Sequence, residues 1–275
     1  MRQGIISVSI IAAFALVSIS SRPLAAQSSI PSAQTPVSNP QAVSFASRSL
    51  GVLTGATEVS DVTLTGTATR TAGSDDESGS VTLKALGTTN SRMDLSLSNA
   101  TFSEIRTWTN NAPQGVWLGP SDAYNAMAAD NCLTDAVWFF PALSVLSQLS
   151  NPNLIANYVG QETRGQESVL HLQFFLTVPT PSIDPFGRYS KLTTEDLYLD
   201  SSSLLPVALA FNTHPDNNAL INIPVEVDFS NYETVSGVQV PFHIQQLKNG
   251  TLFLDLTIQN ASVNSGLTES AFSAY

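Results

Sequence analysis

Apolar and polar residues alternate with a period of two along much of this 275-residue chain, and this pattern limits the possible folds more than any other feature. A strand places successive side chains on opposite faces, so alternation is typical of strands with one buried and one solvated face. Such strands pair as antiparallel hairpins, whereas strands of parallel sheets are apolar on both faces. The alternating segments are 62–69, 81–85, 93–97, 170–178, 225–229, 238–244 and 252–258. The chain is therefore expected to be a mainly antiparallel β protein of the α+β class.

Local signals indicate where the strands turn. Asn249-Gly250 lies between two alternating segments and is a strong signal for a two-residue hairpin turn. Residues 73–79 are rich in Gly, Ser and acidic residues and are expected to form a solvated hairpin tip. A metal-binding loop is the alternative there, but the ligand spacing around a central glycine is missing. Pro241 cannot donate a ladder hydrogen bond, so its strand is expected to be bulged or at an edge.

Two segments show helical spacing. The first begins at Asn39-Pro40, where Asn can cap the helix and Pro can take its first position, and Gly55 is expected to end it. The second, 138–149, would be apolar over most of its circumference, so it must be enclosed by another layer, a partner or a ligand. A sheet of about ten strands curls instead of staying flat. The predicted architecture is one domain, a curved sheet with helices covering its concave face.

The first 26 residues have the pattern of a cleaved secretory signal. A basic start with Arg2 precedes an uncharged apolar run, and small residues stand before the predicted cleavage at Gln27. The run is too short to span a bilayer comfortably, which takes about 20 residues, although an uncleaved anchor is the alternative. Residues 27–39 are rich in Ser, Pro and Gln and are expected to be a disordered linker before a single domain, 40–275. The protein is therefore expected to be periplasmic or secreted.

The charge and the composition of the chain limit the kinds of partner that it can bind. The formal net charge of the whole chain is −11, and loss of Arg2 and Arg22 with the signal would leave 9 basic against 22 acidic residues. Such a chain is repelled by nucleic acid and by anionic membrane surfaces. No second long apolar stretch occurs, so no stable membrane insertion of the mature chain is expected. Cys132 is the only cysteine, so it is expected to be a small buried apolar residue in a core without disulfides.

No motif for catalysis or metal binding occurs, and no catalytic residue, metal ligand or cofactor is predicted. The histidines, His171, His214 and His243, do not have ligand spacing and are expected at the surface. Glu195 and Asp196 are adjacent, so in a strand they point to opposite faces and suit neither a shared proton nor glycoside cleavage. A Ser-His-Asp triad could still assemble from distant residues.

The second half of the chain also resembles a known family. The residues that carry this resemblance are Asn157-Tyr158-Val159-Gly160 with Glu162, Leu170-His171-Leu172, Leu197-Tyr198-Leu199-Asp200, Leu205-Pro206-Val207, Val227-Asp228-Phe229-Ser230-Asn231-Tyr232, Gly237-Val238-Gln239-Val240-Pro241, Val263-Asn264 and Phe272. In this order they resemble secreted bacterial members of the periplasmic lipoprotein-carrier superfamily, which has the LolA/LolB-like fold. The resemblance implies a curved, incomplete β-barrel that encloses an apolar cavity under helices, with an acyl chain as ligand.

The apolar segment after Val137 supplies the predicted lining of that cavity. The predicted ligand-binding residues are Trp138, Phe139, Phe140, Leu143 and Leu146. An apolar cavity suits acyl chains, whose binding is mostly burial of area at about 0.8 kcal/mol per methylene. The expected function is therefore the binding of a hydrophobic small molecule, a lipid or acyl chain. Two alternatives are a secreted hydrolase whose site is not visible in the sequence, and a structural or surface β-domain with no ligand.

Overall fold

The structure is a computed structural model that describes residues 36–73, 75–120, 123–179, 183–184 and 186–274. The predicted signal peptide, 1–26, and most of the predicted linker, 27–39, lie outside the described residues. Within the described part of the chain, no helix has both the length and the apolar character needed to cross a membrane.

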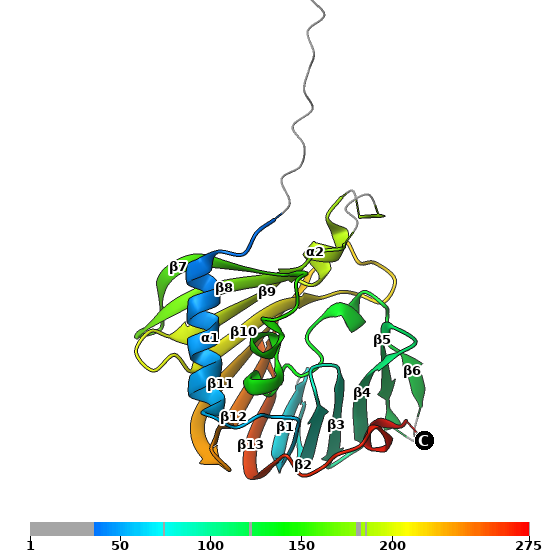
Figure 1. Cartoon of the computed structure of the whole chain (residues 1–275). Coiled ribbons are helices and arrows are strands. Elements are labelled where there is room, and N and C mark those ends of the chain that lie inside the picture. Colours follow the sequence, from blue (N-terminus) through cyan, green and yellow to red (C-terminus); the bar gives the residue numbers. More distant parts are fainter. Residues whose placement is uncertain (1–35, 74, 121–122, 180–182, 185, 275) are drawn as a thin grey trace, which may run out of the picture. The chain divides into compact units, whose positions relative to one another are not determined.

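The described part of the chain contains one antiparallel sheet of 13 strands, in the order β6-β5-β4-β3-β2-β1-β13-β12-β11-β10-β9-β8-β7 (Figure 1). The strands are β1 (Asp61–Ala72), β2 (Asp75–Leu86), β3 (Asn90–Leu97), β4 (Thr101–Thr109), β5 (Ala112–Leu118), β6 (Tyr124–Ala126), β7 (Leu154–Arg164), β8 (Glu167–Leu176), β9 (Glu195–Asp200), β10 (Pro206–Thr213), β11 (Ile223–Val235), β12 (Val238–Lys248) and β13 (Thr251–Val263). The outer strands β6 and β7 are not neighbours, so the sheet curves without closing. The predicted fold class, a curved incomplete β-barrel of antiparallel strands, is confirmed.

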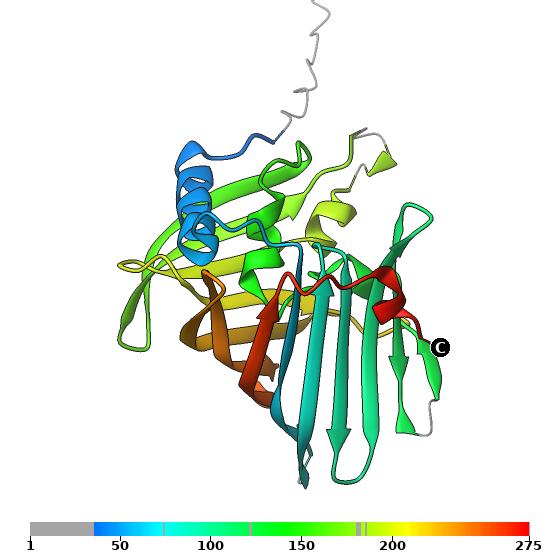
Figure 2. The same cartoon turned by 60° about the horizontal axis from the view of Figure 1, so that its bottom comes forward.

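The pairing of β1 with β13 joins the first and last strands of the chain near the middle of the sheet. In Figure 2 the strands β1 to β5 run in a clearly different direction from β7 to β10. Pro241 pairs with Tyr232 of β11, while the pairing of β12 with β13 begins only at His243. Pro241 therefore lies at a local edge, where its missing N–H costs no ladder hydrogen bond, as predicted.

Helix α1 (Pro40–Thr54) forms where the sequence predicts it. The Asn39 side chain accepts hydrogen bonds from the backbone N–H groups of Gln41, at 2.8 Å, and Ala42, at 3.2 Å. Gly55, with φ of 59°, ends the helix by donating its N–H to the Gly51 carbonyl. The buried face consists of Ala42, Ala46, Ser49 and Leu53. This face packs on the concave side of the sheet, against β7 and β12 (Figure 1).

The helix predicted over 138–149 is not formed, and this part of the prediction is wrong. The segment instead contains two short 3₁₀ helices, η3 (Pro141–Leu143) and η4 (Val145–Gln148). Pro141 disfavours a helical conformation at Phe140, which has φ −136° and ψ 92°. Ser144, with φ −82° and ψ −156°, separates the two 3₁₀ helices. The segment still packs beside α1 on the concave face, so its apolar residues are enclosed from several sides.

The hairpin at Asn249-Gly250 is confirmed. Lys248 pairs with Thr251, and the two turn residues have φ of 51° and 73°, as a type I′ turn requires. The other predicted tip, 73–79, is too long, because β2 already begins at Asp75 and its acidic residues pair with β1. No group of three metal-ligating side chains occurs among the described residues.

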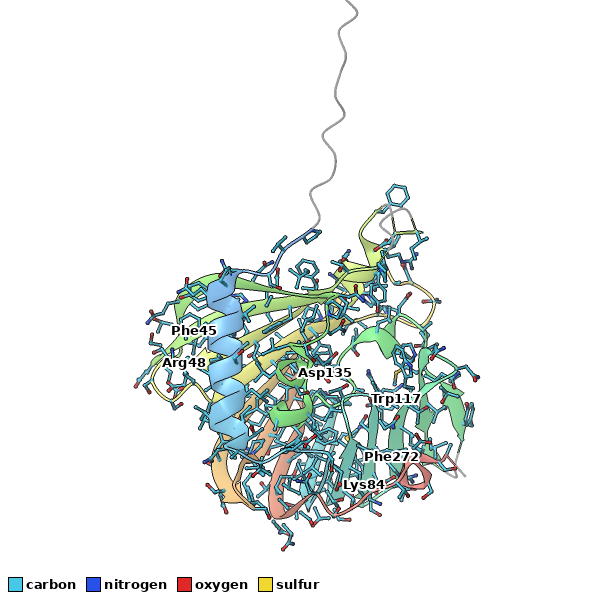
Figure 3. The ribbon with its side chains drawn as sticks, in the orientation of Figure 1. Phe45, Arg48, Lys84, Trp117, Asp135 and Phe272 are labelled. Carbon is cyan, nitrogen blue, oxygen red and sulfur yellow. The ribbon has the colours of Figure 1, made fainter. Side chains whose placement is uncertain are left out.

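A second, smaller apolar cluster covers the outer face of β4 and β5. Ile105 and Leu118 pack there against Phe272 of η6 (Glu269–Phe272), near the C-terminal end (Figure 3). Because both faces of β4 are covered, three consecutive residues are buried, Glu104, Ile105 and Arg106. Glu104 and Arg106 face inward and place two charged groups in the interior, next to the cavity described in the next subsection.

Candidate ligand-binding cavity

The predicted ligand-binding residues all lie in the main apolar core. Trp138, Phe139, Phe140, Leu143 and Leu146 are each at most 3% exposed and belong to one contiguous cluster. The rings of Trp138 and Phe139 meet edge to face with their centroids 5.6 Å apart. None of the five is among the residues that line the main cavity, although their neighbour Val145 is. Their role in ligand binding therefore stays a prediction.

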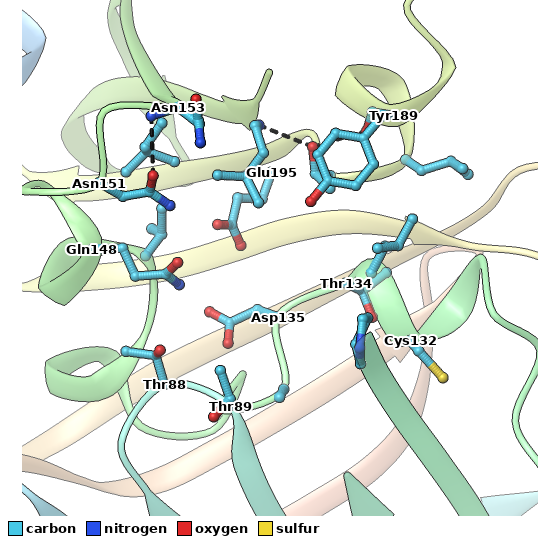
Figure 4. Close-up of a pocket in the computed structure, with 18 of the residues that line it drawn as sticks. Thr88, Thr89, Cys132, Thr134, Asp135, Gln148, Asn151, Asn153, Tyr189 and Glu195 are labelled. Carbon is cyan, nitrogen blue, oxygen red and sulfur yellow. Dashed lines mark hydrogen bonds between the residues drawn. The ribbon is translucent and has the colours of Figure 1, made fainter. Parts of the chain in front are cut away.

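A cavity of about 510 Å³ lies between the sheet and the segments that cover it. One part of its wall is apolar and consists of Val145, Leu154, Leu176, Leu192 and Phe211. Another part is polar and includes Thr88, Thr89, Gln148, Asn151 and Asn153 (Figure 4). Trp108, half exposed, also lines it. The volume falls within the roughly 300–1,000 Å³ that small-molecule pockets occupy.

Two carboxyl groups, of Asp135 and Glu195, face each other inside this cavity (Figure 4). Glu195 is 9% exposed and lies on the inward face of β9, the same face as Leu197 and Leu199. Asp135 precedes the apolar 136–140 segment, and its Oδ1 accepts a hydrogen bond of 2.7 Å from the Val137 N–H. The Oδ2 of Asp135 and the Oε2 of Glu195 are buried and have no hydrogen-bond partner among the described residues.

Burial raises the pKa of both carboxyl groups. The pKa of Asp135 is raised to about 6 by burial, against the opposing effects of the Val137 N–H, the charge of Arg106 and the Val145 N–H. The pKa of Glu195 is raised well above its ordinary value by burial and by the nearby charges of Asp135 and Asp196. Because the two groups interact, they titrate as a pair.

Arg106, from β4, is the only cationic residue among those that line the cavity in the described part of the chain. Its Nε donates a 2.8 Å hydrogen bond to Oε1 of Glu104, and its Nη1 donates to the Thr134 carbonyl and hydroxyl oxygens at 3.1 and 2.9 Å. These bonds fix the covering segment onto the sheet. They also pair the guanidinium with Glu104, so Arg106 acts on Asp135 through its charge alone, and no ion pair joins Asp135 or Glu195 to a cation in the described part of the chain.

The histidines are less exposed and better partnered than predicted. His214 is 5% exposed, and its Nδ1 lies 2.9 Å from the Ile221 carbonyl, so the prediction of a surface position is wrong for it. His171 lies between two carboxylates, with Nε2 2.8 Å from Asp196 and Nδ1 3.2 Å from Glu162. Both carboxylates and the ring belong to the polar face of β7–β9, so they are separate from Glu195. His171 has these partners because the alternating pattern places the polar side chains of neighbouring strands side by side on one face of the sheet.

A Ser-His-Asp array also exists outside the cavity. The His243 ring lies 3.1 Å from the Ser230 hydroxyl through Nδ1 and 3.0 Å from Asp255 through Nε2. The three residues come from β11, β12 and β13, and Ser230 is exposed. None of them lines the cavity described above. Ser230 lines a second, more open pocket of about 380 Å³, but His243 and Asp255 do not, so the three side chains do not face one common space.

The sequence analysis missed the meeting of Asp135 with Glu195. It predicted correctly that Glu195 and Asp196 point to opposite faces, since Glu195 is inward and Asp196 contacts His171. The signal that could have found the site is the register of β9, where an acidic residue takes the position of an apolar one two residues before Leu197. Its partner lies about 60 residues away in a segment without regular structure, and no local pattern links the two.

Comparisons with known proteins identify the fold. No family model and no curated protein matches the sequence. Among solved structures, a domain named for outer membrane lipoprotein sorting from Vibrio parahaemolyticus matches with a TM-score of 0.54 at 12% identity, covering 84% of this chain and 96% of that one. A DUF1329 family protein from Desulfovibrio piger matches with a TM-score of 0.53 at 10% identity, covering 85% and 96%. A LolA superfamily protein from Nitrosomonas europaea has a TM-score of 0.49 at 10% identity, covering 84% and 97%.

The matches to the Vibrio and Desulfovibrio proteins define a class of architecture, an open antiparallel sheet wrapped around a covered concave face. In particular, the chain has the LolA/LolB-like fold that the sequence resemblance implies.

Proposed function

We propose that this protein binds a hydrophobic small molecule, a lipid or acyl chain, in the 510 Å³ cavity and acts as a non-catalytic carrier outside the cytoplasm. The observation that supports this most is the cavity itself, which has an apolar wall under the covering segments of a lipoprotein-sorting fold. Burial of about ten methylenes there would contribute about 8 kcal/mol before the costs of association. After an association cost of about 4 kcal/mol, this gain corresponds to binding in the millimolar range, so contacts beyond these methylenes are needed for tighter binding.

The five predicted ligand-binding residues have an indirect place in this proposal. They form the packed layer behind Val145, and we expect them to hold the apolar wall in position beside the ligand. Trp138, Phe139, Phe140, Leu143 and Leu146 would then affect affinity through the shape of the wall.

The proposed location rests on the N-terminal pattern and the charge. Cleavage of the predicted signal before Gln27 would release a mature chain of strongly acidic composition into the periplasm or the medium. N-terminal sequencing of the protein from its natural host should then give Gln27 or a close neighbour. An intact Met1 on protein held in the membrane would contradict this part of the proposal.

Blocking the cavity tests the proposed binding. Gln148 lines the cavity, so Gln148→Trp should fill part of it. Isothermal titration with dodecanol, a neutral long-chain probe, should show binding by the wild type and at least about tenfold weaker binding by the variant, a difference of about 1.4 kcal/mol. Gln41→Trp, on the exposed side of α1, is the matched control and should bind as the wild type does. Equal binding by all three proteins would remove the cavity from the proposal, and absence of binding by all three would favour a structural domain.

A further inference from the structure

The unmatched carboxyl groups of the cavity require an explanation. A buried polar atom without a hydrogen-bond partner destabilises a fold, so such atoms are rare in native proteins. Here two of them lie on facing side chains in one cavity, the Oδ2 of Asp135 and the Oε2 of Glu195. Glu195 is 9% exposed and extends from the apolar face of its strand, so it cannot turn to bulk solvent without moving β9.

The missing partner must donate hydrogen bonds and should carry positive charge. Carboxylate oxygens are acceptors, and the Arg106 guanidinium is already held by Glu104 and Thr134. A ligand with a carboxylate head would add a third acidic group to this site. An ammonium group carries three donors and one positive charge, which fits two facing carboxyl groups.

We propose that Asp135 and Glu195 form the headgroup subsite of the cavity, and that the ligand is an amphiphile with a protonated primary amine as its head. The ammonium donates to Oδ2 of Asp135 and Oε2 of Glu195. The alkyl part lies along the apolar wall of Val145, Leu154 and Leu176. This inference rests on the proposed function, because it names the class of ligand for the same cavity.

The subsite predicts the direction of the pH dependence. The other ionisable groups near it are Arg106 of β4, Asp196 of β9, Cys132 of the 3₁₀ helix η2 (Asn131–Leu133) and Tyr189 of α2 (Arg188–Leu192). Burial raises the pKa of Cys132 and of Tyr189, so both stay neutral where the carboxyl pair titrates. Bound ammonium favours the ionised carboxylates, so affinity for an alkylamine should rise from pH 5.5 to pH 8. A ligand with a carboxylate head would show the opposite trend.

Titration calorimetry with three probes of equal chain length tests the subsite. Dodecylamine, dodecanol and dodecanoate are each titrated into the full mature protein below their aggregation concentrations, at pH 5.5 and pH 8. At pH 8 the amine should bind at least about tenfold more tightly than the alcohol, and Glu195→Gln should reduce the ratio of the two affinities to about one. Glu167→Gln, an exposed carboxylate at the start of β8, is the control and should behave as the wild type. Asp135→Asn is the second variant and should weaken amine binding in the same direction.

The outcomes separate the two proposals. Binding of dodecanol with no preference for the amine, or an amine preference that survives in Glu195→Gln and Asp135→Asn, would overturn the subsite and leave the proposed function standing. Tighter binding of dodecanoate than of dodecylamine at pH 8 would also overturn it. Absence of binding for every probe at both pH values would overturn the proposed function together with this inference. If Glu195→Gln does not fold, the order of the three probe affinities for the wild-type protein tests the subsite, which requires the amine to bind most tightly.

Discussion

At the scale of residues, the environment on each face of a strand sets the chemistry of its carboxyl groups. Glu195 and Asp196 are consecutive in β9, yet one is enclosed in the cavity and the other contacts the His171 ring on the polar face. Burial and the charge of Asp135 raise the pKa of Glu195. A buried acid of this kind destabilises the free protein and is available to a ligand that supplies its partner.

The carboxyl pair should make the stability of the free protein fall as pH rises. Both groups have a folded-state pKa above the ordinary values of 3.8 and 4.5, so between these values and the raised ones the unfolded chain binds fewer protons than the folded chain. The free energy of unfolding therefore falls as pH rises from about 4 toward 8. Below pH 4 both groups are protonated in the folded and unfolded chains, and this pH dependence disappears. Asp135→Asn should recover roughly 1–3 kcal/mol at pH 8, since one pKa unit corresponds to about 1.4 kcal/mol. Urea denaturation of the wild type and the variant at pH 5 and pH 8 measures this gain in stability.

Glu195→Gln should act in the same direction, and Glu167→Gln, at an exposed position, provides the control. If neither cavity variant gains more stability at pH 8 than at pH 5, relative to the wild type, then these carboxyl groups are not raised in pKa by burial.

The Arg106–Glu104 pair is predicted to hold the covering segment on the sheet. Both side chains are less than 10% exposed, so Arg106→Met would leave Glu104 charged and buried without its hydrogen-bonded partner, although the charge of Lys248 would still act on it. Loss of one partner of a buried pair costs about 3–5 kcal/mol. Arg188→Met is the matched control, because Arg188 is 61% exposed and its pair with Asp130 should contribute less than about 1 kcal/mol. Chemical denaturation of both variants gives the comparison.

A double variant checks the cause. Arg106→Met with Glu104→Met removes both charges and should recover much of the stability lost in the single variant. If the double variant is no more stable than Arg106→Met alone, the loss comes from packing of the arginine and not from an unpaired carboxylate.

At the scale of elements, strands were easier to predict from the sequence than the covering segment. Alternation located most of the strands, and the capping signals of Asn39 and Gly55 placed α1. The apolar segment 138–149 has helical spacing, but Pro141 and Ser144 interrupt it and enclosure on several sides stabilises the irregular backbone. Periodicity shows that such a segment must be buried, and it does not show which backbone conformation will bury it.

Phe139 tests how well this segment is packed. Its side chain is 1% exposed in the main core, so Phe139→Ala should reduce the free energy of unfolding by about 3–5 kcal/mol through transfer and cavity terms. Phe186→Ala removes a ring that is 93% exposed and should change stability by less than about 0.5 kcal/mol. Thermal denaturation compares the two. A loss below about 1 kcal/mol in Phe139→Ala would mean that a void already lies beside this ring, and would favour its predicted place in the cavity lining.

At the scale of the whole described domain, the open sheet and the interrupted covering segment together leave a cavity. The sheet is curved, α1 covers one part of its concave face, and the 3₁₀ segment covers another (Figure 1). The sequence predicted this arrangement through strand patterns and a family resemblance. The position of the cavity could not be predicted, because it depends on contacts between β4, β9 and the 127–149 segment that are distant in sequence.

The central claim, that this cavity holds a hydrophobic molecule, is tested most directly by native mass spectrometry of protein purified from its natural host without denaturation. Wild-type protein should carry one additional mass that organic solvent releases, and Gln148→Trp should lose it while Gln41→Trp keeps it. A spectrum that shows only the bare polypeptide for all three proteins, both as purified and after incubation with a lipid extract of the host, would contradict the account.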